Sequence, residues 1–169
     1  MGSRSRKTAV IGMYIAVAMI CSYIESLIPF YFGIPGVKLG LANLAVLLAM
    51  YTLGTGPAFV VSVSRIVLTG FLFGNAFSIL YSLAGGLLSF VVMWLLLRTK
   101  KLGAVSVSAA GGISHNIGQI LVAAAIVENY RILYYIPVLL AAGLITGLLI
   151  GILAQELLAR FPFRMNGED

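Results

Sequence analysis

The chain has 169 residues, of which 61% are hydrophobic and 9% are charged, and its net charge is +6. A soluble domain carries about 25% charged residues, so a chain with a mean hydropathy of +1.08 cannot cover its surface with polar groups. The composition therefore excludes a soluble globular protein and predicts an integral membrane protein. The single cysteine, Cys21, excludes an internal disulfide.

Long apolar runs predict six membrane helices in a single transmembrane domain, residues 1–169. A bilayer core about 30 Å thick requires ~20 helical residues for one crossing. The runs are 8–28, 39–53, 57–73, 77–97, 104–127 and 132–158. The second is short for a full crossing, and Pro137 predicts an interfacial turn or a kink early in the sixth. The predicted fold class is an all-α bundle of six transmembrane helices.

Lys and Arg residues near the span ends predict that both termini are cytoplasmic. With six spans, the two terminal segments and the loop between spans four and five lie on one side. These segments hold eight of the eleven Lys and Arg residues: Arg4, Arg6, Lys7, Arg98, Lys100, Lys101, Arg160 and Arg164. Cytoplasmic loops are enriched in such residues. The charges therefore follow membrane topology, and no nucleic-acid partner is expected.

The first span carries a face of small residues and one acidic residue near its outer end, Glu25. Gly12 and Ala16 stand four apart, and Ala9 lies nearly one turn earlier. Such spacing lets helices approach closely. Packing within the bundle is its ordinary role. Docking of another membrane protein is the alternative, and this face suits it because it is nearly free of polar groups.

Two cations are candidate ligand-binding residues. Lys38 lies in the loop GIPGVKLGLAN, which ends at Asn43 and whose glycines let the backbone fold closely around a ligand. Arg65, within the third span, is always charged and requires a carboxylate, carbonyl groups or an anionic ligand. A structural pair with Glu25 and contact with a ligand both remain open. Convergence of Lys38, Arg65 and His115 would favour a carboxylate, phosphate or diphosphate.

Aromatic residues gather in the outer half of the predicted spans, among them Tyr81 in the fourth. An interfacial belt accounts for most of them. A belt is roughly two-sided, however, and this distribution is not. We therefore include Tyr81 among the residues expected to line or roof a site open to the outside.

The fifth span contains a polar stripe that includes the only histidine. His115 and Gln119 stand four apart, Asn116 lies beside them, and glycines border the stripe. An unpaired polar group in this setting costs several kcal/mol, so the stripe faces a neighbouring helix or a polar cavity. For Asn116 and Gln119, hydrogen bonds to other helices are an equally strong alternative.

Motifs for catalysis are missing from the sequence. It has no G-x-x-x-x-G-K-[ST] phosphate loop, and its only aspartate is Asp169. One histidine without cysteines or carboxylates at ligand spacing gives no zinc site. The chain is predicted not to be an enzyme and to hold no metal or cofactor of its own.

Three motifs resemble the Gx transporter family, whose members are labelled heptaprenyl diphosphate synthase component I. They are PGVKLGLANL (Pro35–Leu44), SRIVLTGFLFGNAFSILYSLAGGLLSF (Ser64–Phe90) and SHNIGQI (Ser114–Ile120). That family is similar to the S components of energy-coupling factor (ECF) transporters. The resemblance implies a bundle in a prokaryotic cell membrane that binds a small molecule on the extracellular side.

The resemblance also implies partners. They are a transmembrane scaffold subunit and cytoplasmic ATPase subunits, which use ATP on behalf of the complex. In S components a small-residue face of the first helix docks the scaffold, and Ala9, Gly12 and Ala16 match that face. They do so as Gly-x-x-x-Ala rather than as the usual pair of alanines.

Three functions follow, in this order. The first is an S component that captures a small anionic molecule, with an isoprenoid or quinone precursor suggested by the synthase label. The alternative is a non-catalytic membrane accessory subunit of a prenyl diphosphate synthase, which predicts a soluble, aspartate-rich partner. A stand-alone carrier ranks third, because the spans show no obvious internal repeat and few buried carboxylates.

Overall fold

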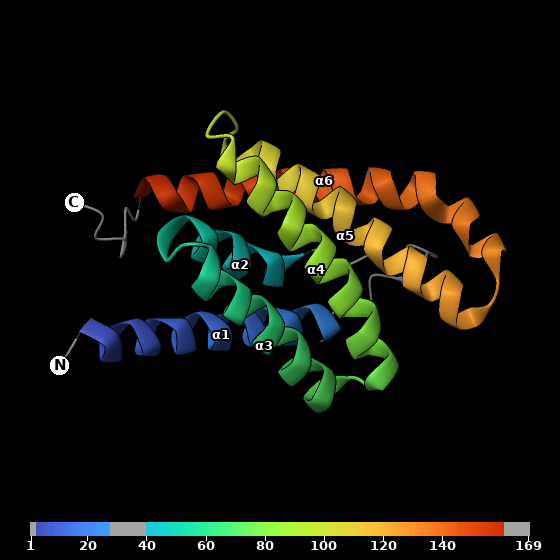
Figure 1. The fold of residues 1–169 in the computed structure, drawn as a ribbon, viewed down its shortest axis with the longest axis horizontal. Coiled ribbons are helices and arrows are strands. Elements are labelled where there is room, and N and C mark those ends of the chain that lie inside the picture. Colours follow the sequence, from blue (N-terminus) through green and yellow to red (C-terminus); the bar gives the residue numbers. More distant parts are fainter. Residues whose placement is uncertain (1–2, 28–39, 161–169) are drawn as a thin grey trace.

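The computed structural model describes residues 3–27 and 40–160 and shows a helical bundle with no strand in those ranges (Figure 1). The helices are α1 (Ser3–Leu27), α2 (Leu41–Thr52), α3 (Thr55–Phe73), α4 (Ala76–Arg98), α5 (Ala104–Val127), the 3-10 helix η1 (Tyr130–Tyr135) and α6 (Ile136–Arg160). By length and composition, five helices suffice to cross a membrane, η1 being counted with α6. The predicted all-α, multi-pass membrane protein is confirmed.

The helix α2 is short and enclosed. Its 12 residues extend about 18 Å at 1.5 Å per residue, which is less than the ~30 Å of a bilayer core. It packs against α1, α3 and α6, and seven of its side chains are buried. Gly40 precedes it with φ 78°, a left-handed conformation that favours glycine. This helix is therefore too short to cross the whole bundle, as the short second run indicated.

The connections explain where several helices begin. The side chain of Asn75 caps α4 by accepting a hydrogen bond from the backbone N–H of Ser78 at 2.8 Å. Asn129 does the same for η1, accepting from the N–H of Arg131 at 3.1 Å. Pro137 falls in the first turn of α6, where proline is tolerated. The sixth run therefore begins with a turn, η1, which is one of the two alternatives that Pro137 left open.

Glycines bring α5 into close contact with α6 on one side and α4 on the other. A Cβ atom built on Gly143 would lie 2.6 Å from the carbonyl oxygen of Gly112, and one on Gly147 would lie 2.7 Å from that of Ser108. Toward α4, a Cβ on Gly118 would lie 2.7 Å from the carbonyl oxygen of Ala84. These small residues therefore serve packing within the bundle.

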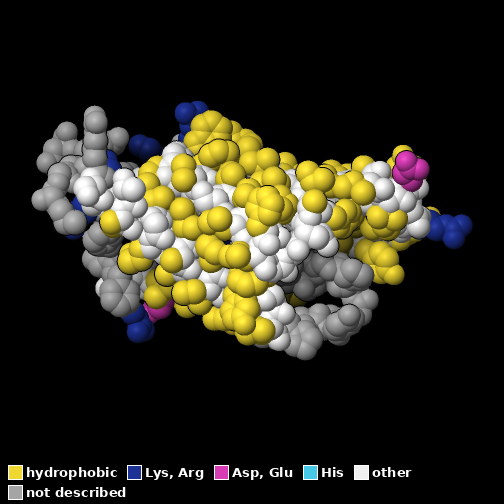
Figure 2. All heavy atoms as spheres, turned by 90° about the horizontal axis from the view of Figure 1, so that it is seen from below, with side chains coloured by type: hydrophobic (Ala, Val, Ile, Leu, Met, Phe, Trp, Pro, Cys, Tyr) yellow, Lys and Arg dark blue, Asp and Glu magenta, His cyan; other side chains and the backbone are white. Residues whose placement is uncertain are grey.

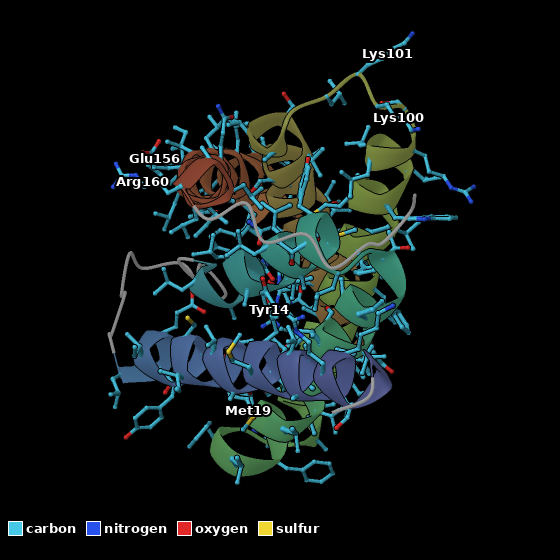
Figure 3. All side chains as sticks on the ribbon, turned by 90° about the vertical axis from the view of Figure 1, so that its left-hand side faces the viewer. Tyr14, Met19, Lys100, Lys101, Glu156 and Arg160 are labelled. Carbon is cyan, nitrogen blue, oxygen red and sulfur yellow. The ribbon has the colours of Figure 1, made fainter. Side chains whose placement is uncertain are left out.

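Charged side chains mark the ends of the molecule. The helix α1 begins and α6 ends at the same end of the bundle, on the left in Figure 1. Lys100, Lys101 and Arg160 project outward at this end (Figure 3), which we call the basic end. The opposite end is the η1 end. Figure 2 shows hydrophobic side chains covering the middle of one face, with charged ones at its ends.

The apolar core occupies the half of the bundle nearer the basic end. Its buried residues come from every α-helix and include Ala18, Leu47, Val61, Phe90, Val107 and Ala154. Tyr14 points from α1 into the bundle (Figure 3), and its hydroxyl group lies 3.0 Å from Thr52 Oγ1 on α2. The half nearer the η1 end contains buried polar side chains such as Asn116 and Gln119 beside apolar ones such as Ile120 and Leu139.

Candidate functional site

A polar cavity of about 180 Å³ lies toward the η1 end, and every α-helix contributes to its wall. One water molecule needs ~10–15 Å³ of such space, so the cavity has room for a small organic molecule. Its charged and amide-bearing residues, together with histidine, are Glu25, Asn43, Arg65, His115, Asn116 and Gln119. Hydroxyl groups come from Ser22, Ser26, Thr69, Ser78, Ser82 and Thr146.

Arg65 is held in the wall by α2. Its Nη2 atom donates a hydrogen bond of 2.7 Å to Asn43 Oδ1. Its Nε atom is buried and has no hydrogen-bond partner among the described residues, and the same is true of Thr69 Oγ1, four residues later on α3. Within the described chain, this part of the wall thus holds more hydrogen-bonding capacity than its neighbours use.

Glu25 is a residue of α1 whose side chain contacts the start of α2. Its Oε1 atom accepts a hydrogen bond of 3.0 Å from the backbone N–H of Leu41, where the helix dipole favours a negative charge. No ion pair joins it to Arg65, because the only pair within 4.0 Å in residues 3–27 and 40–160 is Arg160 with Glu156. Of the two possibilities that the sequence left open for Arg65, the ion pair with Glu25 is not formed in this structure.

The polar stripe of α5 faces both the cavity and its neighbouring helices. Asn116 Nδ2 donates a 2.7 Å hydrogen bond to the carbonyl oxygen of Leu139 on α6, which is the helix-to-helix role that the sequence left open. Gln119 is buried, and a Cβ built on Gly85 would lie 2.6 Å from its Cγ atom. The same Cβ would lie 3.1 Å from His115 Cε1. Gly85 thus makes room for both side chains.

Two predicted site residues are not placed at the cavity. Lys38 lies outside the described residues. The ring of Tyr81 stacks on Phe77, with centroids 6.1 Å apart, and Tyr81 does not line the cavity. Among the described residues, Phe73 contributes an aromatic ring to the wall, and its centroid lies 5.0 Å from that of Tyr23.

The serine residues of the wall were missed by the sequence analysis. Ser22 and Ser26 stand four apart on α1, and Ser78 and Ser82 stand four apart on α4. That spacing, on the same face as Glu25 in the case of α1, was the available signal. The described residues contain no group of three or more His, Cys, Asp or Glu side chains placed to hold a metal ion.

The predicted docking residues lie on the surface. Ala9, Gly12 and Ala16 are exposed, and a Cβ built on Gly12 would meet nothing within 4 Å among the described residues. Large apolar neighbours on α1, such as Met13 and Ile20, are exposed as well. This face differs from the glycine faces of α5 and α6, which are occupied by other helices of the bundle.

An all-helical, multi-pass membrane protein with a polar cavity between its helices is the class that these observations define. The chain matches, over residues 14–157, the family described as heptaprenyl diphosphate synthase component I, and it belongs to that family. The match confirms the family assignment made from the three motifs. No curated protein and no solved structure matches the chain.

Proposed function

We propose that the chain is the substrate-binding membrane subunit, or S component, of an ECF-type ATP-driven importer. The observation that carries the proposal is Arg65 in the cavity wall, with its buried Nε atom unpartnered among the described residues. A guanidinium presents five N–H donors in a planar fork that matches a carboxylate or phosphate. A buried donor without a partner costs about 1–3 kcal/mol. An anionic group on a captured small molecule removes that cost.

The direction of capture follows from the distribution of charge. Cytoplasmic ends of membrane proteins are rich in Lys and Arg, so we propose that the basic end faces the cytoplasm of a prokaryotic cell. The cavity then lies in the outer half of the membrane. The family description suggests an isoprenoid or quinone precursor as the cargo.

Import requires partners in this proposal. The exposed small-residue face of α1, formed by Ala9, Gly12 and Ala16, is the surface on which a transmembrane scaffold subunit docks. Cytoplasmic ATPase subunits bound to that scaffold use the ATP. The family description supports a second candidate, a non-catalytic membrane subunit of a prenyl diphosphate synthase.

Native mass spectrometry of the protein purified from its own host in mild detergent tests the proposal. We expect a small-molecule adduct on the wild type that is lost in Arg65→Ala, because the variant removes the fork that binds the anion. The matched control is Arg131→Ala, which removes an exposed arginine near the η1 end and retains the adduct. An adduct that survives in Arg65→Ala contradicts the assigned binding site.

The subunits that purify with the wild type separate the two candidates. A membrane scaffold together with ATPase subunits is expected for an importer. Co-purification of a soluble, aspartate-rich subunit, with no small-molecule adduct, supports the second candidate, a synthase subunit. It contradicts the importer proposal.

A further inference from the structure

The cavity wall holds charges of both signs, whereas capture of an anion uses only the positive one. Glu25 on α1 and Arg65 on α3 are the charged residues among its described lining. They are not joined by an ion pair within 4.0 Å, yet both line the same cavity. The cavity is thus lined by an anionic group from α1 and a cationic group from α3.

Each of the two charged side chains has a neutral hydrogen-bond partner on α2. Asn43 accepts the hydrogen bond of Arg65 at 2.7 Å, and the backbone N–H of Leu41 donates to Glu25 at 3.0 Å. Arg65 and Glu25 each keep a hydrogen-bonding atom that no residue of the described chain uses. Arg65 Nε has no partner there, and the second carboxylate oxygen of Glu25 accepts no hydrogen bond there. Charges in the membrane interior are costly without partners, so a ligand that pairs with both is favoured over one that pairs with Arg65 alone.

We infer that the ligand is a small amphoteric molecule, whose anionic group binds Arg65 and whose ammonium or similar cationic group binds Glu25. The inference rests on the proposed function, but it assigns a cargo of different charge from the isoprenoid diphosphate that the family description brings to mind. It stands against a purely anionic cargo such as an isoprenoid diphosphate. The negative charge of such a molecule would share the cavity with the carboxylate of Glu25 and bring no cation to offset it.

Glu25 also has a structural role at the start of α2, and one variant separates that role from ligand binding. Glu25→Gln keeps an oxygen that can accept the N–H of Leu41 but removes the negative charge. If Glu25 only caps α2, this variant binds ligands as the wild type does.

The test uses matched probes that differ by one ammonium group: phosphoethanolamine with ethyl phosphate, and 4-aminobutyrate with butyrate. Isopentenyl diphosphate serves as a larger pure anion. Thermal unfolding of the purified protein ranks the probes, and titration calorimetry gives their Kd values. We expect an amine-bearing member to stabilise the wild type more than its partner does. In Glu25→Gln its affinity falls by roughly ten- to a hundred-fold, as for loss of a hydrogen bond between charged groups, and the preference within the pair disappears.

Three results overturn the inference: stabilisation of the wild type by the pure anions alone, stabilisation by no member of the panel, or equal affinity of Glu25→Gln and wild type for the amine-bearing probe. The comparison on the wild type needs no variant, so it decides the question even if Glu25→Gln fails to fold. Binding of ethyl phosphate without phosphoethanolamine, lost in Arg65→Ala, refutes the amphoteric ligand but leaves the substrate-binding proposal standing. Binding of an amphoteric probe by a protein that purifies without importer partners supports the amphoteric ligand but contradicts the importer proposal.

Discussion

Asn43 determines how much of Arg65 is available to a ligand. Its Oδ1 atom accepts one N–H of the guanidinium and thereby fixes the side chain in the cavity wall. Because the amide is neutral, it positions the positive charge without cancelling it. An acidic residue at the same place would position the positive charge and also cancel it.

Substitutions at Asn43 are therefore expected to separate stability from binding. Asn43→Ala removes the acceptor and lowers the free energy of unfolding by about 1–3 kcal/mol, because the guanidinium loses a partner. Asn43→Asp keeps an acceptor and the fold, but its carboxylate pairs with Arg65 and weakens anion binding at least about ten-fold. Thermal unfolding and probe titration measure the two effects. Wild-type affinity in Asn43→Asp would show that the charge of Arg65 is not used.

Cavity residues were predictable from the sequence where burying the side chain in a membrane costs much free energy. They were missed where that free-energy cost is small. Arg65 and His115 stand out in an apolar span because burying them needs an explanation. Serine fits into a membrane helix at little cost, so Ser78 and Ser82 gave a weaker signal. Tyr81 was predicted from its depth alone. Its place beside Ser82 turns it about 100° around the helix, where it stacks on Phe77 instead of facing the cavity.

At the scale of elements, α5 and α6 are held together by backbone contact. A Cβ on Gly143 would approach the carbonyl oxygen of Gly112 and the side chain of Asn116, at 2.6 and 2.8 Å. Backbone atoms cannot rotate away as a long side chain does. The two helices therefore have to separate if either glycine gains a side chain.

Gly143→Ala is expected to lower the free energy of unfolding by about 1–3 kcal/mol, the usual cost of overpacking. Gly12→Ala is the matched control, because both glycines lie within long helices and a Cβ on Gly12 meets nothing within 4 Å among the described residues. The control should leave stability unchanged or raise it by up to ~1 kcal/mol through helix propensity. Thermal unfolding in detergent compares them. Equal stability of the two variants would contradict the close α5–α6 contact.

Helix positions were predictable from the sequence, but helix neighbours were not. The run 104–127 coincides with α5, and 57–73 differs from α3 only at its start. Apolar length and the glycines and charges that follow it determine these bounds. Which helix each glycine meets depends on tertiary packing: Gly112 meets α6, whereas Gly118 meets α4.

At the scale of the whole molecule, the proposed orientation puts the basic end inside the cell and the η1 end outside. Two single-cysteine proteins, Lys101→Cys and Glu128→Cys in a Cys21→Ala background, test it, since both positions are exposed. A membrane-impermeant maleimide should label position 128 on intact cells, and position 101 only after the cells are opened. The opposite pattern would place the cavity toward the cytoplasm and rule out capture from outside.

The apolar core and the polar cavity are built from different turns of the same helices. The residues that line the cavity are therefore not members of the apolar core. Ser78, Ser82 and Thr146 line the cavity without belonging to the core, so exchanging them changes the pattern of donors and acceptors while the core keeps every contact among its own residues. This separation makes the bundle a suitable scaffold for redesigning ligand preference. Substitutions are confined to the half nearer the η1 end, and the apolar core in the other half is left unchanged.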